Sequence, residues 1–135
     1  MKDIVEDFGR YAGKLWQKLD TYGYLTKNKA MKTTNLKKYE FYAAVGWLAR
    51  ENKINKKGDV YKLGKTNLVD NIGKDAGKIW TMLQTWNEAD PFSITKLTGL
   101  NEEKTYNALG WLAREGKIKS EWIKPVEPRI RFRLK

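Results

Sequence analysis

The sequence contains the same unit twice, because residues 4–54 align without a gap with residues 68–118 at an offset of 64 positions. About twenty of the 46 aligned positions that end at Ile54 are identical in the two copies. Such self-similarity is typical of folds built from repeated structural units, so it is interpreted before any local pattern. Each unit has about 65 residues, near the lower size limit for a domain that folds alone. We therefore predict two repeats, repeat 1 (1–64) and repeat 2 (65–135), that pack against each other.

The residue types missing from the chain exclude several kinds of chemistry. The sequence contains no cysteine and no histidine, so it offers neither thiolate nor imidazole for metal binding or catalysis. A serine nucleophile at Ser93 or Ser120 would lack its usual histidine base. The carboxylates show no paired spacing on a helix face, and no glycine-rich phosphate loop is present. We therefore expect no enzymatic activity, no cofactor and no metal site.

The hydropathy pattern gives no sign of a membrane protein. No apolar segment approaches the roughly 20 residues that a transmembrane helix needs. The N-terminal residues 1–4, Met-Lys-Asp-Ile, lack the apolar core of a signal peptide. These features predict a cytoplasmic protein with no membrane partner.

The chain is strongly basic, with 27 lysines and arginines, 16 acids and a net charge of +11. Repeat 1 has 14 basic and 7 acidic residues, net +7, and repeat 2 has 13 and 9, net +4. A charge excess of this size on a small protein attracts polyanions. Nucleic acid and an anionic membrane surface both fit this sign, and solubility alone is the simpler interpretation.

Each repeat shows the pattern of three helices. Apolar residues recur at helical spacing along 4–20 and 68–84, which predicts a long amphipathic helix at the start of each repeat. A short helix is expected within 90–100 and at the equivalent place in repeat 1. A third helix is predicted over about 37–51 and 101–115, again with one apolar face.

Turn residues mark the ends of these helices. Ser93 is the predicted N-cap of the short helix in repeat 2. Asn35 and Gly99 follow the short helices, and Asn52 and Gly116 follow the third helices. Both residue types tolerate the left-handed backbone that a tight turn or a helix C-cap requires.

A β-hairpin is predicted at the end of each repeat. In repeat 1 it covers residues 53–63, with a turn at 56–59. In repeat 2 it is longer by about seven residues, and Pro125 and Pro128 are confined to its loop. Its return strand, 129–134, alternates strictly between arginine and apolar residues, so three arginines share one face.

The order helix, short helix, turn, long helix, hairpin is that of a winged helix-turn-helix. The fold class expected is mainly α with small β-hairpins (α+β), as a tandem winged helix-turn-helix. Two patterns occur in both copies: AGK-x-W at 12–16 and 76–80, and GWLARE-x-KI at 46–54 and 110–118. In these patterns the chain resembles a small bacterial and archaeal winged helix-turn-helix family of unknown function, whose members usually hold one copy. The resemblance implies the fold and a DNA-binding role.

Candidate DNA-binding residues follow from where such a fold meets DNA, at the start of its third helix, the preceding turn and the hairpin wing. Around the turn of repeat 1 the candidates are Lys27, Lys29, Lys32, Lys37 and Lys38. A helical wheel places Lys37, Glu40 and Ala43 on the outward side of the third helix of this repeat. On its wing they are Lys56 and Lys57. In repeat 2 the helical wheel gives Asn101, Lys104 and Asn107 on the outward face, and the wing gives Arg129, Arg131 and Arg133. An ordinary solvated helix face remains the alternative for each helical residue taken singly.

The two repeats differ in charge near this turn. Repeat 2 carries Asp90, Glu102 and Glu103 where repeat 1 is rich in lysine. Acids in the first turn of a helix also stabilise the helix dipole. They nevertheless repel phosphate, so we expect repeat 1 to supply most of the affinity for a nucleic acid backbone.

Several features of the third helix are more simply structural. Gly46 and Gly110 interrupt it at a cost of about 1 kcal/mol each, which indicates close helix packing, expected near 12–13 and 76–77. Three places are open for Trp47 and its counterpart Trp111: under the hairpin beside Tyr61 or Phe132, between the repeats, or stacked on a base. Trp16 and Trp80, at equivalent positions of the two copies, are expected in the core or between the repeats. Arg50-Glu51 and Arg114-Glu115 are expected to form local ion pairs or contacts to the hairpin.

The sequence thus favours a non-catalytic protein that binds double-stranded DNA, as a transcriptional regulator or a chromosome-associated factor. The duplication suggests a monomeric pseudo-dimer, with recognition helices about 34 Å apart to meet successive major grooves; a homodimer is the other oligomeric state considered. The main alternative is a protein–protein interaction scaffold, which would expose an apolar patch containing Trp47 or Trp111. Binding of RNA or single-stranded DNA would require exposed aromatic residues on the basic surface.

Overall fold

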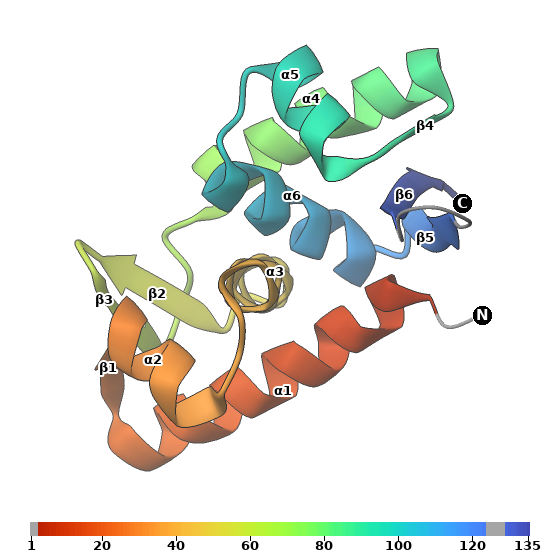
Figure 1. Cartoon of the computed structure of the whole chain (residues 1–135). Coiled ribbons are helices and arrows are strands. Elements are labelled where there is room, and N and C mark those ends of the chain that lie inside the picture. The colour runs from red at the N-terminus through yellow and green to blue at the C-terminus, as the bar shows by residue number, and fades with distance from the viewer. Residues whose placement is uncertain (1–2, 124–128) are drawn as a thin grey trace.

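The computed structural model describes the backbone of residues 3–123 and 129–135 and the side chains of residues 3–121 and 130–135. Repeat 1 contains α1 (Ile4–Tyr22), β1 (Tyr24–Thr26), α2 (Lys27–Thr34), α3 (Lys38–Arg50), β2 (Ile54–Lys57) and β3 (Val60–Leu63). Repeat 2 contains α4 (Val69–Trp86), β4 (Glu88–Ala89), α5 (Pro91–Thr98), α6 (Glu102–Arg114), β5 (Ile118–Ile123) and β6 (Arg129–Leu134). Figure 1 shows α3 and α6 in the middle of the molecule, with α1 and α4 on opposite sides of them.

Each repeat has a three-stranded antiparallel sheet, in the order β1-β3-β2 and β4-β6-β5. The predicted hairpins are confirmed, but the turn of the first is tighter than 56–59, because Lys57 pairs with Val60 inside the sheet. The sequence pattern does not predict β1 and β4, since strands of three and two residues are too short to show alternation. The fold is the expected tandem winged helix-turn-helix, mainly α with small sheets.

Capping side chains set where the helices begin and end. The carboxylate of Asp90 accepts a hydrogen bond of 2.7 Å from the backbone N–H of Ser93, and Pro91 occupies the start of α5. The prediction that Ser93 is the N-cap is therefore wrong, since Asp caps equally well and Pro suits the first helical position. The predicted left-handed residues are confirmed at Asn35, Asn52, Gly99 and Gly116.

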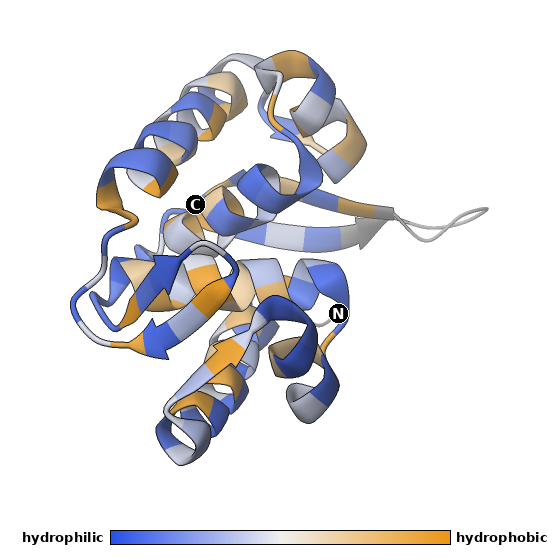
Figure 2. Ribbon diagram, turned by 90° about the vertical axis from the view of Figure 1, so that its left-hand side faces the viewer, coloured by the Kyte–Doolittle hydropathy of each residue, from blue (hydrophilic) through white to orange (hydrophobic). Residues whose placement is uncertain are grey.

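The apolar faces of both repeats meet in one continuous core. Figure 2 shows hydrophobic and hydrophilic residues sharing each long helix, as expected of amphipathic elements. In repeat 1 the rings of Phe41 and Tyr61, both fully buried, meet edge to face with centroids 5.2 Å apart. The ring of Phe8 on α1 lies 6.3 Å from that of Phe132 on β6. Helix α1 therefore contributes to the core of repeat 2 as well as to its own.

The closest contact between the repeats is the crossing of α3 and α6. A Cβ atom on Gly46 would lie 1.8 Å from the carbonyl oxygen of Asn107, and one on Gly110 would lie 2.0 Å from that of Ala43. In Figure 1 α3 is seen end-on and α6 from the side, so the two helices cross steeply. Close packing at both glycines is confirmed. The expected partners at 12–13 and 76–77 are wrong, because Gly46 packs against α6 and Gly110 packs against α3.

The four tryptophans that occupy equivalent positions in the two repeats form two groups. Trp47 is half-buried and packs on Gly9 of α1, whose Cβ would lie 2.9 Å from the indole ring. Trp111 takes the equivalent place in repeat 2. Trp16 and Trp80 are 40% and 37% exposed, so the prediction that they are core or inter-repeat residues is wrong. They adjoin the buried stripe of their helices without entering it.

Two equivalent ion pairs connect the ends of α3 and α6. The Arg50 Nε atom lies 3.0 Å from Glu115, and the Arg114 Nε atom lies 2.8 Å from Glu51. Arg50 also lies 5.6 Å from the centroid of a Trp111 ring, and Arg114 makes the equivalent contact in the other repeat. The expectation of local pairs is wrong for the arginines, because each Arg pairs with the Glu of the other copy. It is confirmed for the glutamates, since Glu51 also pairs with Lys53 at 3.6 Å and Glu115 with Lys117 at 3.5 Å. Together with the two glycine contacts, the crossed pairing of the arginines relates the repeats by an approximate two-fold axis.

The start of each first helix is tied to a wing. The carboxylate of Asp3 caps α1 and also accepts hydrogen bonds from the backbone N–H and the hydroxyl of Ser120 on β5. At the equivalent place before α4, the Asn67 side chain accepts 3.0 Å from the N–H of Lys56 and donates 2.6 Å to its carbonyl oxygen. These contacts hold the helices and wings of the two repeats in one arrangement.

Candidate functional site

The two helices that would enter DNA grooves in a winged helix-turn-helix are packed against each other. The expected separation of about 34 Å is therefore wrong. Most of α3 is buried, including Ala43, which the helical wheel placed outward. The outward placement of Asn107 is also wrong, because its backbone lies against Gly46 and its Oδ1 atom is buried without a hydrogen-bond partner. The wheel misplaces both residues because α3 and α6 are covered on two sides, by the first helix of their own repeat and by each other.

The exposed residues of α3 and α6 lie in their first turns and at their last residues, Arg50 and Arg114. Lys37 and Lys38 are exposed, and the backbone N–H of Lys37 donates 2.8 Å to the carboxylate of Glu40. At the start of α6, the side chain of Asn101 accepts 2.8 Å from the N–H of Lys104, and both residues are exposed. Asn101 is thus the N-cap of α6, and its side-chain oxygen already has a donor.

Repeat 1 brings exposed lysines together around α2. Lys29 and Lys32 lie on the outer side of this helix, which at eight residues is about 12 Å long. Its first residue, Lys27, donates its backbone N–H to the Asp59 carbonyl in the wing turn at 3.1 Å, so this end of α2 adjoins Lys57. We use the name basic surface for five exposed lysines on these adjacent elements: Lys29, Lys32, Lys37, Lys38 and Lys57. None of the five forms an ion pair with another residue that the structure describes.

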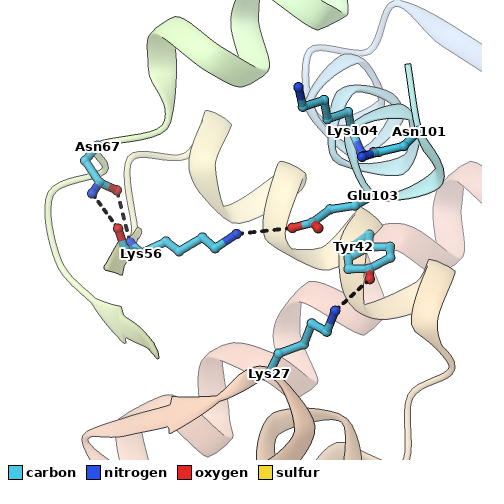
Figure 3. A network of polar contacts seen from close by, with 7 residues as sticks. All are labelled: Lys27, Tyr42, Lys56, Asn67, Asn101, Glu103 and Lys104. Carbon is cyan, nitrogen blue, oxygen red and sulfur yellow. Dashed lines mark hydrogen bonds and ion pairs between the residues drawn. The ribbon is translucent and has the colours of Figure 1, made fainter. Parts of the chain in front are cut away.

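The side chain of Lys27 lies apart from this surface. Its Nζ atom donates 3.0 Å to the hydroxyl of Tyr42 on α3, as Figure 3 shows. This hydrogen bond raises the pKa of the Lys27 ammonium. Burial acts in the opposite direction, and the electrostatic effects of Tyr42 and Glu103 raise the pKa further. The Lys27 side chain therefore links α2 to α3 and does not point outward.

Lys56 is also engaged inside the molecule. Its Nζ atom lies 3.1 Å from the carboxylate of Glu103 on α6, so the first wing is joined to repeat 2 (Figure 3). A groove of about 550 Å³ lies along this boundary between the two repeats. Four of the predicted residues, from both repeats, line it: Lys56, Asn101, Lys104 and Asn107. We call it the seam groove.

The predicted arginine ladder on the second wing is partly neutralised. Arg131 pairs with Glu88 of β4, the neighbouring strand, at 2.5 Å. Arg133 is exposed. The side chain of Arg129 lies outside the described residues, as do Pro125 and Pro128. The sequence does not reveal the pairing of Arg131, because it requires the unexpected strand β4.

The structure exposes an apolar group that the sequence reading does not single out. Trp86, Phe92 and Leu97 are 58%, 67% and 47% exposed at the end of α4 and on α5. Alignment of the repeats gives a signal for two of them, since Phe92 and Leu97 replace Asn28 and Thr33 of repeat 1. Trp47 and Trp111 are not among the exposed large apolar residues of the described chain.

The comparisons agree with this architecture. The family model described as winged helix-turn-helix domain (DUF2582) matches the chain twice, over residues 1–63 and 65–125. Comparison with curated proteins and with solved structures finds no match. Within the described residues no helix is long and apolar enough to span a membrane, and the same part of the chain has no group of three acidic metal-ligating side chains.

Proposed function

The chain belongs to the winged helix-turn-helix domain family DUF2582, and from this premise we propose that it binds double-stranded DNA without catalysis, mainly through the phosphate backbone. The observation that carries the proposal is the basic surface of repeat 1. Its lysines are exposed on the two helices and the wing of the fold, and the described part of the chain gives them no ion-pair partner. Cations in this position contact phosphate oxygens and orient the protein on the duplex.

Repeat 2 is less suited to this role. The equivalent surface carries Asp90, Glu102 and Glu103, and its wing arginine Arg131 is paired. Asp90 caps α5 and Glu103 is paired with Lys56, so the exposed Glu102 is the acid that a DNA phosphate would meet at the start of α6. We therefore assign the main contact to repeat 1, with Arg133 as the exposed cation of the second wing.

The packing of α3 on α6 favours backbone contacts over base readout. Reading base edges requires a helix face that can enter the major groove. Beyond its first turn, α3 offers the half-buried Trp47 and the ion-paired Arg50, and no free polar face. A sequence-tolerant, chromosome-associated factor is therefore favoured over a regulator that recognises one operator.

A pair of charge reversals at equivalent positions tests the proposal. Lys32 on α2 and Lys96 on α5 are both exposed and occupy the same place in their repeats. Lys32→Glu and Lys96→Glu change the net charge equally, so only the position differs. Titration of a labelled duplex at about 50 and 200 mM salt should show weaker binding and a salt slope smaller by about 1 for Lys32→Glu. Equal losses in the two variants would contradict the assignment of the main contact to repeat 1, and absence of binding by the parent protein would reject the function.

Protein binding is the second candidate function, and the exposed group of Trp86, Phe92 and Leu97 is the observation that favours it. This apolar group lies in repeat 2, and a protein bound there would leave the basic surface of repeat 1 free. The two functions are therefore compatible. Replacement of Phe92 and Leu97 by the residues of repeat 1, Asn and Thr, should leave DNA affinity unchanged. If that double variant lost DNA binding, the exposed apolar group would belong to the DNA contact instead.

A further inference from the structure

The seam groove is a polar depression that lies apart from the basic surface. Strand β2, the first turns of α4 and the start of α6 form its walls, so both repeats contribute to it. Its volume of about 550 Å³ is within the range of small-molecule sites in proteins. Such sites are usually apolar, whereas charged and amide side chains line most of this one. A polar, charged ligand is therefore the kind it fits.

The approximate two-fold axis provides an internal comparison, because repeat 1 fills the equivalent place with side chains. Asp75 of the groove corresponds to Tyr11, and Lys104 corresponds to Glu40. Tyr11 is 7% exposed, and burial together with the nearby Glu40 carboxylate raises its pKa. A buried tyrosine thus occupies in repeat 1 the position that lines an open groove in repeat 2.

The groove presents cations that are free to bind an anion. Lys74, Lys78 and Lys104 line it and are exposed. None of them forms an ion pair within the described part of the chain, whereas Lys56 is paired with Glu103. Figure 3 shows the Lys104 side chain extending from α6 away from Glu103, toward α4. Three cations on two facing helices can share one phosphate group.

The groove also presents acceptors that a simple anion would leave unused. The Oδ1 atom of Asn107 is buried and has no hydrogen-bond partner, and a buried polar atom of this kind usually has one. The carboxylate of Asp75 is half-buried beside the lysines. The Asn107 oxygen lacks a donor and the Asp75 carboxylate can accept hydrogen bonds from a ligand. The volume leaves room for a ligand much larger than inorganic phosphate.

We propose that the seam groove binds a mononucleotide, with its phosphate on Lys74, Lys78 and Lys104 and its amino or hydroxyl donors on Asp75 and Asn107. Phosphate and donor groups on one molecule of this size match the two kinds of side chain in the groove. The ligand lies between β2 of repeat 1 and α6 of repeat 2, so it also bridges the repeats. Binding there is separate from the DNA contact, because the basic surface lies on α2, the start of α3 and the wing turn.

Calorimetric titration with four probes tests the proposal: AMP, GMP, adenosine and inorganic phosphate. We expect a mononucleotide to bind about tenfold or more tightly than adenosine, which lacks the anion, and than phosphate, which lacks the donors. Absence of nucleotide binding would overturn the proposal. Equal affinities for phosphate and AMP would overturn the role of Asp75 and Asn107.

Matched variants locate the site. Lys78 and Lys14 occupy equivalent positions on α4 and α1, and both are exposed, so Lys78→Ala should weaken AMP binding about tenfold while Lys14→Ala leaves it unchanged. The double change Asp75→Tyr with Lys104→Glu introduces the pair that fills repeat 1 and should abolish binding while the protein remains folded by circular dichroism. The Lys32→Glu variant should retain AMP binding even where it loses DNA. Loss of AMP binding in Lys32→Glu but not in Lys78→Ala would place the nucleotide on the basic surface and overturn the assignment.

Discussion

The backbone carbonyl of Asn107 occupies the space where a side chain on Gly46 would begin, 1.8 Å from the position of its Cβ. The same relationship joins Gly110 to Ala43 at 2.0 Å. Helices α3 and α6 can touch through their backbones only because both positions are glycine. This contact joins the two small repeats, and it covers the helix faces through which winged helix-turn-helix proteins generally read bases.

Alanine at these glycines should therefore be strongly destabilising. Gly46→Ala or Gly110→Ala forces the helices apart, and we expect a loss of about 3 kcal/mol or more in the free energy of unfolding. Gly13 and Gly77 are matched controls, since both lie in helices with nothing within 4 Å of a Cβ. Alanine there should stabilise the protein by up to about 1 kcal/mol. Urea unfolding of the four variants measures this difference, and similar values at all four positions would contradict the packing.

The crossed ion pairs predict a modest coupling between the repeats. Arg50 and Arg114 are nearly half exposed, so a double-mutant cycle on Arg50 and Glu115 should give about 0.2–1 kcal/mol of coupling energy. A cycle on Arg114 and Glu51 should give nearly the same value because the two-fold relation makes the surroundings equivalent. Strongly unequal coupling energies, measured by chemical denaturation, would argue against that symmetry.

Stability should fall at alkaline pH because several tyrosines are buried. Burial raises the pKa of Tyr61, and burial followed by the charge effects of Tyr39 and Glu102 raises that of Tyr106. In the unfolded chain a tyrosine ionises near pH 10, so the stabilisation is complete below about pH 10 and is lost as the pH rises further. Each such group contributes at most about 1.4 kcal/mol per pH unit.

A Tyr106→Phe variant checks this effect. It keeps the ring contact with Tyr39, whose centroid lies 5.2 Å away, and removes one ionisable group. Urea unfolding at several pH values from 9 to about 11.5 should show a shallower decline for the variant than for the parent. Parallel declines would indicate that Tyr106 is free to ionise in the folded protein.

Because α3 and α6 are packed against each other, we predict that the protein distinguishes weakly between DNA sequences. Among unrelated duplexes of equal length, affinities should agree within about tenfold at one salt concentration. A protein that recognises one operator prefers it by about 10³–10⁷ over other DNA. Competition of genomic fragments against a single labelled duplex measures this ratio, and enrichment of one short sequence would show that α3 and α6 separate to read bases.

Much of the local structure could be predicted from the sequence. Helix periodicity, the residues at Asn35 and Gly99 and the alternation in the hairpins act over a few residues, and the duplication allowed each pattern to be seen twice. Two strands were too short to be visible in this way. The cap at Asp90 was missed because two good capping residues stand close together.

The site could be predicted only in part. Exposure of Lys29, Lys32, Lys37 and Lys38 follows from a helix and turn that local patterns describe well. The inward positions of Lys27 and Lys56 do not, because their partners Tyr42 and Glu103 are distant in the sequence. The seam groove also depends on such contacts, since side chains from two repeats line it.

The duplication, the order of elements and the excess of positive charge are therefore properties that can be read from the chain alone, since each depends on composition or on neighbours within one or two turns. Which helix faces meet was decided by packing in three dimensions. A glycine at position 46 shows only that something must come close, and the helical wheel cannot distinguish water from another helix on the outward side. Tertiary contact with Asn107 settled that question and left the first turns, the basic surface and the seam groove as the exposed polar sites.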